Sequence, residues 1–99
     1  MNTTIDKAIQ EKIVDIISAL IPNAKIYLFG SRARGTHSKW SDIDLALDTG
    51  KPLTNTNIDE VKSVLAATNI PYKVDVLDFQ SVSTEMQTSI RRDGKLWKN

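Results

Sequence analysis

The stretch that decides the fold is Gly30-Ser31-Arg32-Ala33-Arg34-Gly35-Thr36-His37-Ser38-Lys39-Trp40-Ser41-Asp42-Ile43-Asp44. Its glycine–serine turn follows the apolar run 26–29, and ten residues separate Ser31 from Asp42. Asp42 and Asp44 then open a second apolar run. A glycine lets the backbone approach a phosphate closely, and paired carboxylates suit a divalent metal. The stretch therefore contains the parts needed to handle a nucleoside triphosphate.

Working outward, the chain alternates between helical and strand patterns. Apolar residues at three- and four-residue steps predict a first helix, capped by Thr3 or Thr4 and ending before Pro22. Strands are expected over 25–29, 42–47 and 73–79, and a short helix after Gly30. Two further helices are expected from 55 or 56 to about 69 and from 81 or 83 to about 92; residues 95–97 are a short strand or a tail. In the helix that begins at 55 or 56, the side chains expected to face the core are Ile58, Val61, Val64 and Leu65. This order, αβαβαβα, predicts an α/β (α+β) sandwich with one small sheet.

Composition narrows the class of protein. The 99 residues predict a single domain, 1–99, with little room for a second substrate-binding lobe. The net charge of +1 argues against a polynucleotide substrate, and the absence of cysteine excludes disulfides and thiolate metal sites. No signal peptide or membrane span is apparent, so a cytoplasmic location is expected. Oligomeric state stays open.

Three aspartates are the candidate metal ligands. Asp42 and Asp44 share one face of a strand, with Cα atoms roughly 6.5–7 Å apart. Their mutual repulsion favours cation capture, and their hard oxygens select Mg²⁺ or Mn²⁺. Asp75 lies mid-strand between Val74 and Val76, where a carboxylate is costly without a partner or an ion. If its strand lies beside the second, Asp75 completes a site for two ions roughly 3.5–4 Å apart. An Asp-x-Asp pair alone more often marks a solvated strand face.

The turn supplies the candidate phosphate ligands Gly30, Ser31, Arg32 and Arg34. Ser31 offers a hydroxyl and an N–H at a helix start, and the two guanidinium groups can grip phosphate oxygens. For each arginine taken alone, an ordinary solvent-exposed surface position explains its presence nearly as well as phosphate binding does. Because Thr36 stands where a Walker loop needs lysine, this is not that motif.

Other polar residues near the stretch have simpler interpretations. His37 is expected to be a solvated loop residue and Trp40 to anchor the loop. Asp48 and Asp78 are expected to serve turns or the surface, with Asp78 an outside candidate for the site.

Phe29-Gly30-Ser31, ten residues, then Asp42-Ile43-Asp44-Leu45 resembles the signature of the DNA polymerase β-like nucleotidyltransferase superfamily. Gly-Ser-Arg-Ala-Arg-Gly and Ser-Asp-Ile-Asp-Leu are similar to its minimal nucleotidyltransferase (MNT) branch, and the strand of Asp75 is similar to the one that carries the third carboxylate. The resemblance implies a mixed sheet flanked by helices, and Mg²⁺-dependent transfer from ATP or another NTP. By motif matching, Gly30 and Ser31 hold the triphosphate, and Asp42, Asp44 and Asp75 hold the metals. Small members of this branch pair with a HEPN-type toxin and can AMPylate it.

The leading hypothesis is therefore an Mg²⁺-dependent protein adenylyltransferase, the antitoxin of a HEPN/MNT pair. The group that receives the nucleotide is expected to belong to another molecule, because 99 residues leave little room for an acceptor pocket. One alternative is a non-catalytic module that neutralises a partner by binding. Another is a small-molecule transferase of the aminoglycoside type, although such enzymes usually carry a further helical domain.

Overall fold

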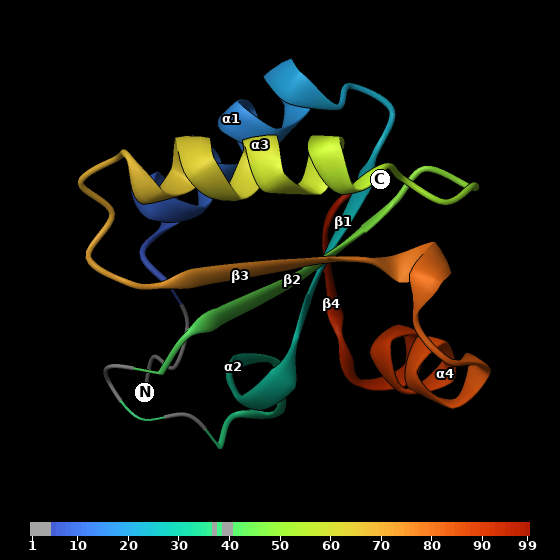
Figure 1. Cartoon of the computed structure of the whole chain (residues 1–99). Helices are drawn as coiled ribbons and strands as arrows, with labels where there is room; N and C mark the ends of the chain where they lie inside the picture. Colours follow the sequence, from blue (N-terminus) through green and yellow to red (C-terminus); the bar gives the residue numbers. More distant parts are fainter. Residues whose placement is uncertain (1–4, 37, 39–40) are drawn as a thin grey trace.

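The computed structural model describes residues 5–36, 38 and 41–99 (Figure 1). Its elements follow the predicted order and add one strand at the end of the chain. The helices and strands, with the 3₁₀ turn η1, are α1 (Lys7–Leu20), β1 (Lys25–Phe29), α2 (Gly30–Arg34), β2 (Ile43–Asp48), α3 (Asn55–Ala66), β3 (Val74–Asp78), η1 (Phe79–Ser81), α4 (Thr84–Asp93) and β4 (Lys95–Lys98).

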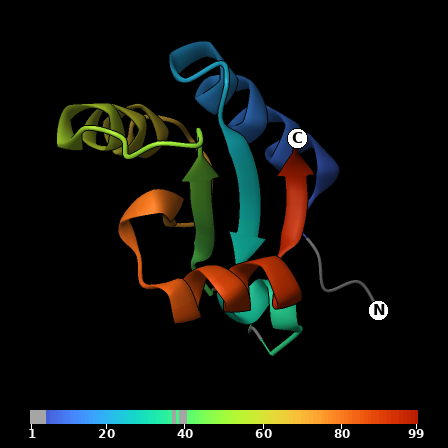
Figure 2. The same ribbon diagram turned by 90° about the vertical axis from the view of Figure 1, so that its right-hand side faces the viewer.

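The strands form one mixed sheet in the order β3-β2-β1-β4. β1 is antiparallel to both β2 and β4, and Figure 2 shows it running between them in the opposite direction. β2 and β3 are parallel, because α3 carries the chain back across the sheet between them. The predicted mixed sheet flanked by helices is thus confirmed.

Each face of the sheet has its own core. On one face, α1 and α3 pack isoleucine, valine and leucine side chains against β1, β2 and β3. On the other face, Ala46, Phe79 and Ile90 form a smaller cluster under α4. Figure 1 shows α1 and α3 on one side of the sheet, with α2 and α4 on the other. The larger core fixes the register of β2, and a one-residue slip would bury its aspartates.

Three details differ from the sequence prediction. Asp6 caps α1 by accepting a hydrogen bond from the Ala8 N–H, whereas Thr3 and Thr4 lie outside the described residues. Thr54 caps α3, one residue before the predicted position. Val64 faces solvent with 38% exposure, because the stripe Ile58, Val61 and Leu65 already fills the inward face of α3.

In the part of the chain that the structure describes, every helix is too short or too polar to cross a membrane.

Candidate active site

The register of three strands brings the predicted site residues together. Phe29, the residue before Gly30, is paired with Asp44 across β1 and β2, and Asp44 is paired with Asp75 across β2 and β3. Both aspartates are half-buried. Ile43 and Leu45, on either side of Asp44, point into the larger core, so the Asp44 side chain points to the opposite face of the sheet, as does that of Asp75. This is the face that α4 covers in part. The sheet therefore aligns the Gly30 turn, Asp44 and Asp75 in one row.

Gly30 presses directly against Asp44. It adopts a left-handed backbone with φ of +75°, which glycine reaches without steric cost. A Cβ placed on Gly30 would overlap Asp44 Oδ2 and lie 3.2 Å from Asp44 Cγ. The turn thus needs glycine for two reasons, the backbone angle and the space for a carboxylate. Gly35 ends the short helix with φ of +76°, and no atom lies within 4 Å of a Cβ placed there.

Electrostatics identify Asp44 as the centre of the carboxylate group. Burial is the largest cause raising the pKa of Asp44 above its ordinary value, and the charges of Asp75 and Asp42 add to it. Arg34 and Lys73 act in the opposite direction and lower this pKa. Three carboxylates and two cations therefore interact electrostatically, although they come from three separate segments: α2, the start of β2 and the start of β3.

The carboxylates fit a divalent cation by donor chemistry. They provide hard oxygen ligands, and the repulsion that raises the Asp44 pKa is relieved when a cation binds. Among residues 5–36, 38 and 41–99, however, no three acidic or histidine side chains already stand as a metal-ligand set. The three aspartates thus share one region of the fold without being gathered around a single point.

The two turn arginines have different surroundings. Arg34 is exposed at the end of α2, near Asp44 and Asp93. Arg32 is only 5% exposed; its Nε donates a hydrogen bond of 3.0 Å to the Ser41 carbonyl. The guanidinium of Arg32 also lies 4.6 Å from the centroid of the Tyr72 ring. Arg32 therefore ties the turn to the residue before Asp42 and to the start of β3, and its phosphate contact stays a prediction.

Asp48 and Asp78 have the structural roles expected for them. Asp78 is 7% exposed and accepts hydrogen bonds from the Leu53 N–H at 2.8 Å and the Ser81 hydroxyl at 2.6 Å. Asp48 accepts from the Gly50 N–H and from the Gln80 side chain. His37 and Trp40 lie outside the described residues.

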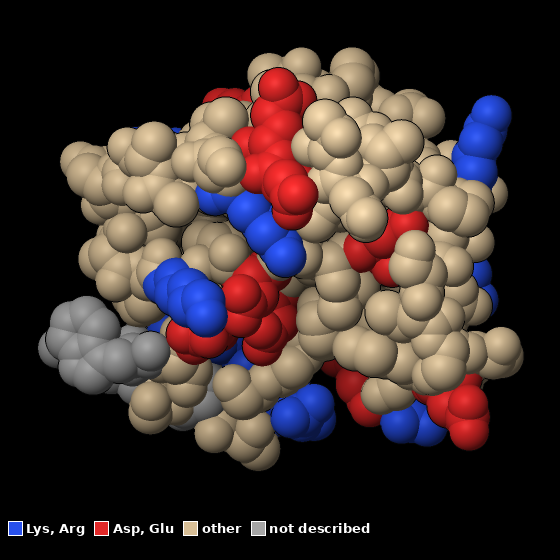
Figure 3. Space-filling model, in the orientation of Figure 1, with Lys and Arg blue, Asp and Glu red and all other residues tan. Residues whose placement is uncertain are grey.

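Sequence reasoning missed the lysine beside the third carboxylate. Lys73 Nζ lies 3.8 Å from Asp75 Oδ1; the Lys73 side chain is mostly exposed and that of Asp75 is about half exposed. Figure 3 shows positive and negative side chains side by side around a hollow on this face of the molecule. The signal was available, because Lys73 stands two residues before Asp75 and so shares its side of the strand.

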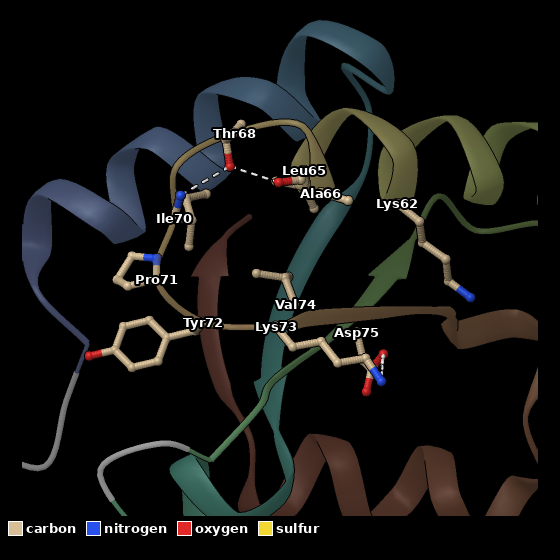
Figure 4. A pocket seen from close by; sticks show the side chains of 10 residues that line it. All are labelled: Lys62, Leu65, Ala66, Thr68, Ile70, Pro71, Tyr72, Lys73, Val74 and Asp75. Carbon is tan, nitrogen blue, oxygen red and sulfur yellow. Dashed lines mark hydrogen bonds and ion pairs between the residues drawn. The ribbon is translucent and has the colours of Figure 1, made fainter.

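Two cavities flank the row of site residues. One, of about 190 Å³, lies between α2 and α4 and is lined in part by Gly30 and Arg34. The other, of about 470 Å³, lies where α3 ends and β3 begins, with Asp75 among its lining residues (Figure 4). The Gly30 turn and Asp75 therefore line different cavities.

Comparison with known proteins agrees with this geometry. The family described as "Polymerase beta, Nucleotidyltransferase" matches residues 11–98. The chain is 34% identical over 77 residues to the probable protein adenylyltransferase MntA of Haemophilus influenzae, covering 78% of this chain and 68% of that protein. It is 36% identical over 90 residues to the protein adenylyltransferase MntA of Shewanella oneidensis, covering 89% of this chain and 64% of that protein. The chain thus spans about two thirds of each relative's length.

Solved structures show the same fold. A crystal structure of a toxin–antitoxin with AMP-PNP gives a TM-score of 0.75 at 34% identity, covering 89% of this chain and 71% of that chain. A structure of a tri-AMPylated Shewanella oneidensis HEPN toxin in complex with MNT antitoxin gives 0.72 at 29% identity, covering 92% and 70%. Because the family match spans most of the chain and the likeness extends to the fold, this chain belongs to the polymerase beta nucleotidyltransferase family.

Proposed function

We propose that this chain transfers AMP, or another nucleotidyl group, from an NTP to a hydroxyl on a partner protein, a HEPN-type toxin. The observation that carries the proposal is the row Gly30, Asp44 and Asp75, which sets a phosphate-binding turn beside two neighbouring strand carboxylates. Further support comes from the relatives named protein adenylyltransferase and from the solved complex that contains an AMPylated HEPN toxin.

The turn is assigned to the triphosphate. Gly30 lets the backbone approach phosphate oxygens, and Ser31 offers its N–H and hydroxyl at the start of α2. Arg34 is exposed and can reach a phosphate, whereas buried Arg32 is assigned mainly to positioning. Through its bond to the Ser41 carbonyl, Arg32 holds the segment that leads into Asp42. Replacing Arg32 should thus act on the phosphate turn and on the carboxylates together.

Asp42, Asp44 and Asp75 are assigned to two Mg²⁺ ions. When bound, the ions would neutralise the charge of the phosphates and of the carboxylate group. Without a cation, the three carboxylates repel each other: after burial, the charges of Asp75 and Asp42 are the next causes that raise the pKa of Asp44. The donor set contains oxygen alone, which favours Mg²⁺ or Mn²⁺ over zinc.

The reaction is a single displacement at the α-phosphorus of the NTP. The acceptor hydroxyl oxygen forms a bond to this phosphorus, and the bond to the bridging oxygen breaks, so that pyrophosphate leaves with the electron pair. The hydroxyl proton passes to the Asp75 carboxylate, which is partly exposed and can release it to water. No other oxidant, reductant or co-substrate is required.

The direct test combines labelled ATP, Mg²⁺ and the protein encoded next to this chain, which the proposal expects to be of the HEPN type. The proposal expects label on the neighbour and release of pyrophosphate. The double variant Asp42→Ala/Asp44→Ala should abolish both. Full neutralisation of the toxin by that variant, with no labelling by the wild type, would show that the chain acts by binding alone.

A further inference from the structure

Lys73 stands among the carboxylates, and the proposed reaction gives it no role. Its Nζ lies 3.8 Å from Asp75 Oδ1, and Figure 4 shows the Lys73 side chain reaching along β3 to that carboxylate. The Lys73 side chain is 70% exposed and that of Asp75 is 48% exposed. Ion pairs that are this open to solvent contribute little to stability. The pair is therefore easily broken, which suits a contact that a bound ligand replaces.

The pairing of β2 with β3 places Lys73 at one corner of a rectangle of four charged residues. Asp44 is paired with Asp75 in the parallel register. The Ile43 N–H donates to the Lys73 carbonyl at 2.9 Å, which extends the register by one residue and sets Asp42 beside Lys73. Residues two apart on an extended chain point to the same face, so the four side chains share one face. Three corners of the rectangle thus carry a carboxylate, and the fourth carries an ammonium.

Lys73 offsets part of the negative charge that the carboxylates bring together. Burial is the largest cause that raises the pKa of Asp44, and the charges of Asp75 and Asp42 raise it further. In the described part of the chain, Arg34 and Lys73 are the cations that act against this rise. Arg34 belongs to the turn assigned to the phosphates, whereas Lys73 contacts a carboxylate assigned to metal. Of the two cations, Lys73 is therefore the one whose place a metal ion would take.

We propose that Lys73 is the carboxylate group's own counter-cation: its ammonium holds Asp75 while the site is free of metal, and it leaves Asp75 when a divalent cation binds there. Lys73 competes with a free metal ion for Asp75 and repels one that is bound beside it. When the metal arrives on a nucleoside triphosphate, Lys73 is instead attracted by the phosphates. Lys73 thus makes the site favour the metal–nucleotide complex over the metal alone. The preference for the complex rests on the proposed function, whereas the competition for Asp75 does not.

The space beside the pair gives the Lys73 side chain room to move. Lys73 and Asp75 both line the cavity of about 470 Å³ where β3 begins (Figure 4). The Lys73 backbone stays in place, because its carbonyl accepts the hydrogen bond from Ile43. Exposed side chains change rotamer within picoseconds to nanoseconds. The ammonium can therefore exchange a carboxylate for a phosphate without any change in the fold.

The test uses two variants of Lys73 and one control. Lys73→Met removes the ammonium and keeps an unbranched side chain, whereas Lys73→Arg keeps the charge. Lys62→Met is the matched control, because Lys62 is exposed on α3, lines the same cavity and loses the same charge.

The probe metal is Mn²⁺, and electron paramagnetic resonance measures its binding with and without α,β-methylene-ATP. This analogue carries three phosphorus groups, but a methylene group replaces the bridging oxygen that would leave with pyrophosphate. No transfer therefore takes place during the measurement, and the readout is independent of activity.

The two affinities of Lys73→Met should change in opposite directions. Mn²⁺ alone should bind roughly three- to tenfold more tightly than to the wild type, because the competing charge beside a half-exposed carboxylate is gone. The complex of Mn²⁺ with α,β-methylene-ATP should bind roughly three- to tenfold more weakly, because the phosphates lose a cation. Lys73→Arg and Lys62→Met should match the wild type in both measurements.

Three results would overturn the proposal. Equal affinity of the wild type and Lys73→Met for Mn²⁺ alone would make the Lys73–Asp75 pair an ordinary surface contact. Weaker binding of both probes by Lys73→Met would make Lys73 a structural residue. The same opposite shifts in Lys62→Met would make the effect one of net charge. Opposite shifts confined to Lys73→Met, in a protein that transfers no nucleotide from ATP, would contradict the proposed transferase function and still support Lys73 as the cation that metal replaces.

Discussion

Replacement of Gly30 by alanine separates the backbone role of the turn from its contact with Asp44. The left-handed φ of +75° costs an alanine about 1–2 kcal/mol. For a domain of this size, that loss lowers the Tm by roughly 4–16 °C. In addition, the new Cβ would overlap Asp44 Oδ2, so the carboxylate must move by on the order of 1 Å. Such a displacement at a reacting centre can reduce the rate about 100-fold.

Gly35→Ala is the matched control. Gly35 has nearly the same φ, +76°, but nothing lies within 4 Å of a Cβ placed there. Both variants should therefore lose similar stability, by about 1–2 kcal/mol. Only Gly30→Ala should lose nucleotide transfer, by roughly 100-fold, and Mg²⁺ binding with it.

Thermal unfolding and the rate of AMP transfer at a temperature where all three proteins are folded give the two readouts. Equal transfer rates in Gly30→Ala and Gly35→Ala would refute the reasoning, because the contact with Asp44 would then have no effect on the site. A much larger loss of stability in Gly35→Ala would contradict the equal cost assigned to the two backbones.

Four further variants test the roles of individual side chains. Asp44→Asn should be more stable than the wild type at pH 7 without metal, by about 0.5 kcal/mol after solvent screening. The sign follows from the raised pKa of Asp44: stability falls as pH rises from the ordinary 3.8 through the higher folded value, so the two proteins should converge at lower pH. Mg²⁺ at roughly ten times its Kd should stabilise the wild type alone, by about 1.4 kcal/mol, and equal stabilisation of both proteins in Mg²⁺ titrations would contradict the metal assignment. Asp78→Ala should lower the free energy of unfolding in urea by about 2–4 kcal/mol, because the Leu53 N–H and the Ser81 hydroxyl lose their acceptor. Asp75→Ala should change this free energy by no more than about 0.5 kcal/mol. A larger loss in Asp75→Ala than in Asp78→Ala would contradict the structural role assigned to Asp78. Arg32→Lys should lose about 1–2 kcal/mol, because an ammonium cannot both stack on Tyr72 and reach the Ser41 carbonyl as a guanidinium does; an unchanged Tm would show that neither contact matters.

The elements were predictable wherever local pattern and tertiary packing agree. The isoleucine stripe of α1 and the alternation in β2 reflect burial against one core, so their periods are visible in the sequence. Sequence alone leaves residues 95–97 open between a strand and a tail, where the structure has β4. Its pairing with β1 is a long-range contact, and its exposed Leu96 breaks the expected alternation. Sequence periodicity cannot report a partner strand nearly 70 residues away.

The site was predictable in its carboxylates and its turn, and less so in its arginines. Asp44 and Asp75 follow from strand positions, and their pairing required only that β2 and β3 be neighbours. The burial of Arg32 depends on Tyr72, which is 40 residues further along the chain. The cavity beside Asp75 is lined by one local stretch, residues 62–75, but its shape depends on how the end of α3, the following loop and the start of β3 fold against each other.

The central claim is tested most directly by the transfer of label from α-labelled ATP to the protein encoded next to this chain, compared between the wild type and Asp75→Asn. The wild type should label the neighbour on a hydroxyl side chain, and Asp75→Asn should do so roughly 100-fold more slowly while it still binds Mg²⁺–ATP. Equal labelling by the two proteins would show that the three aspartates do not act as one transfer centre.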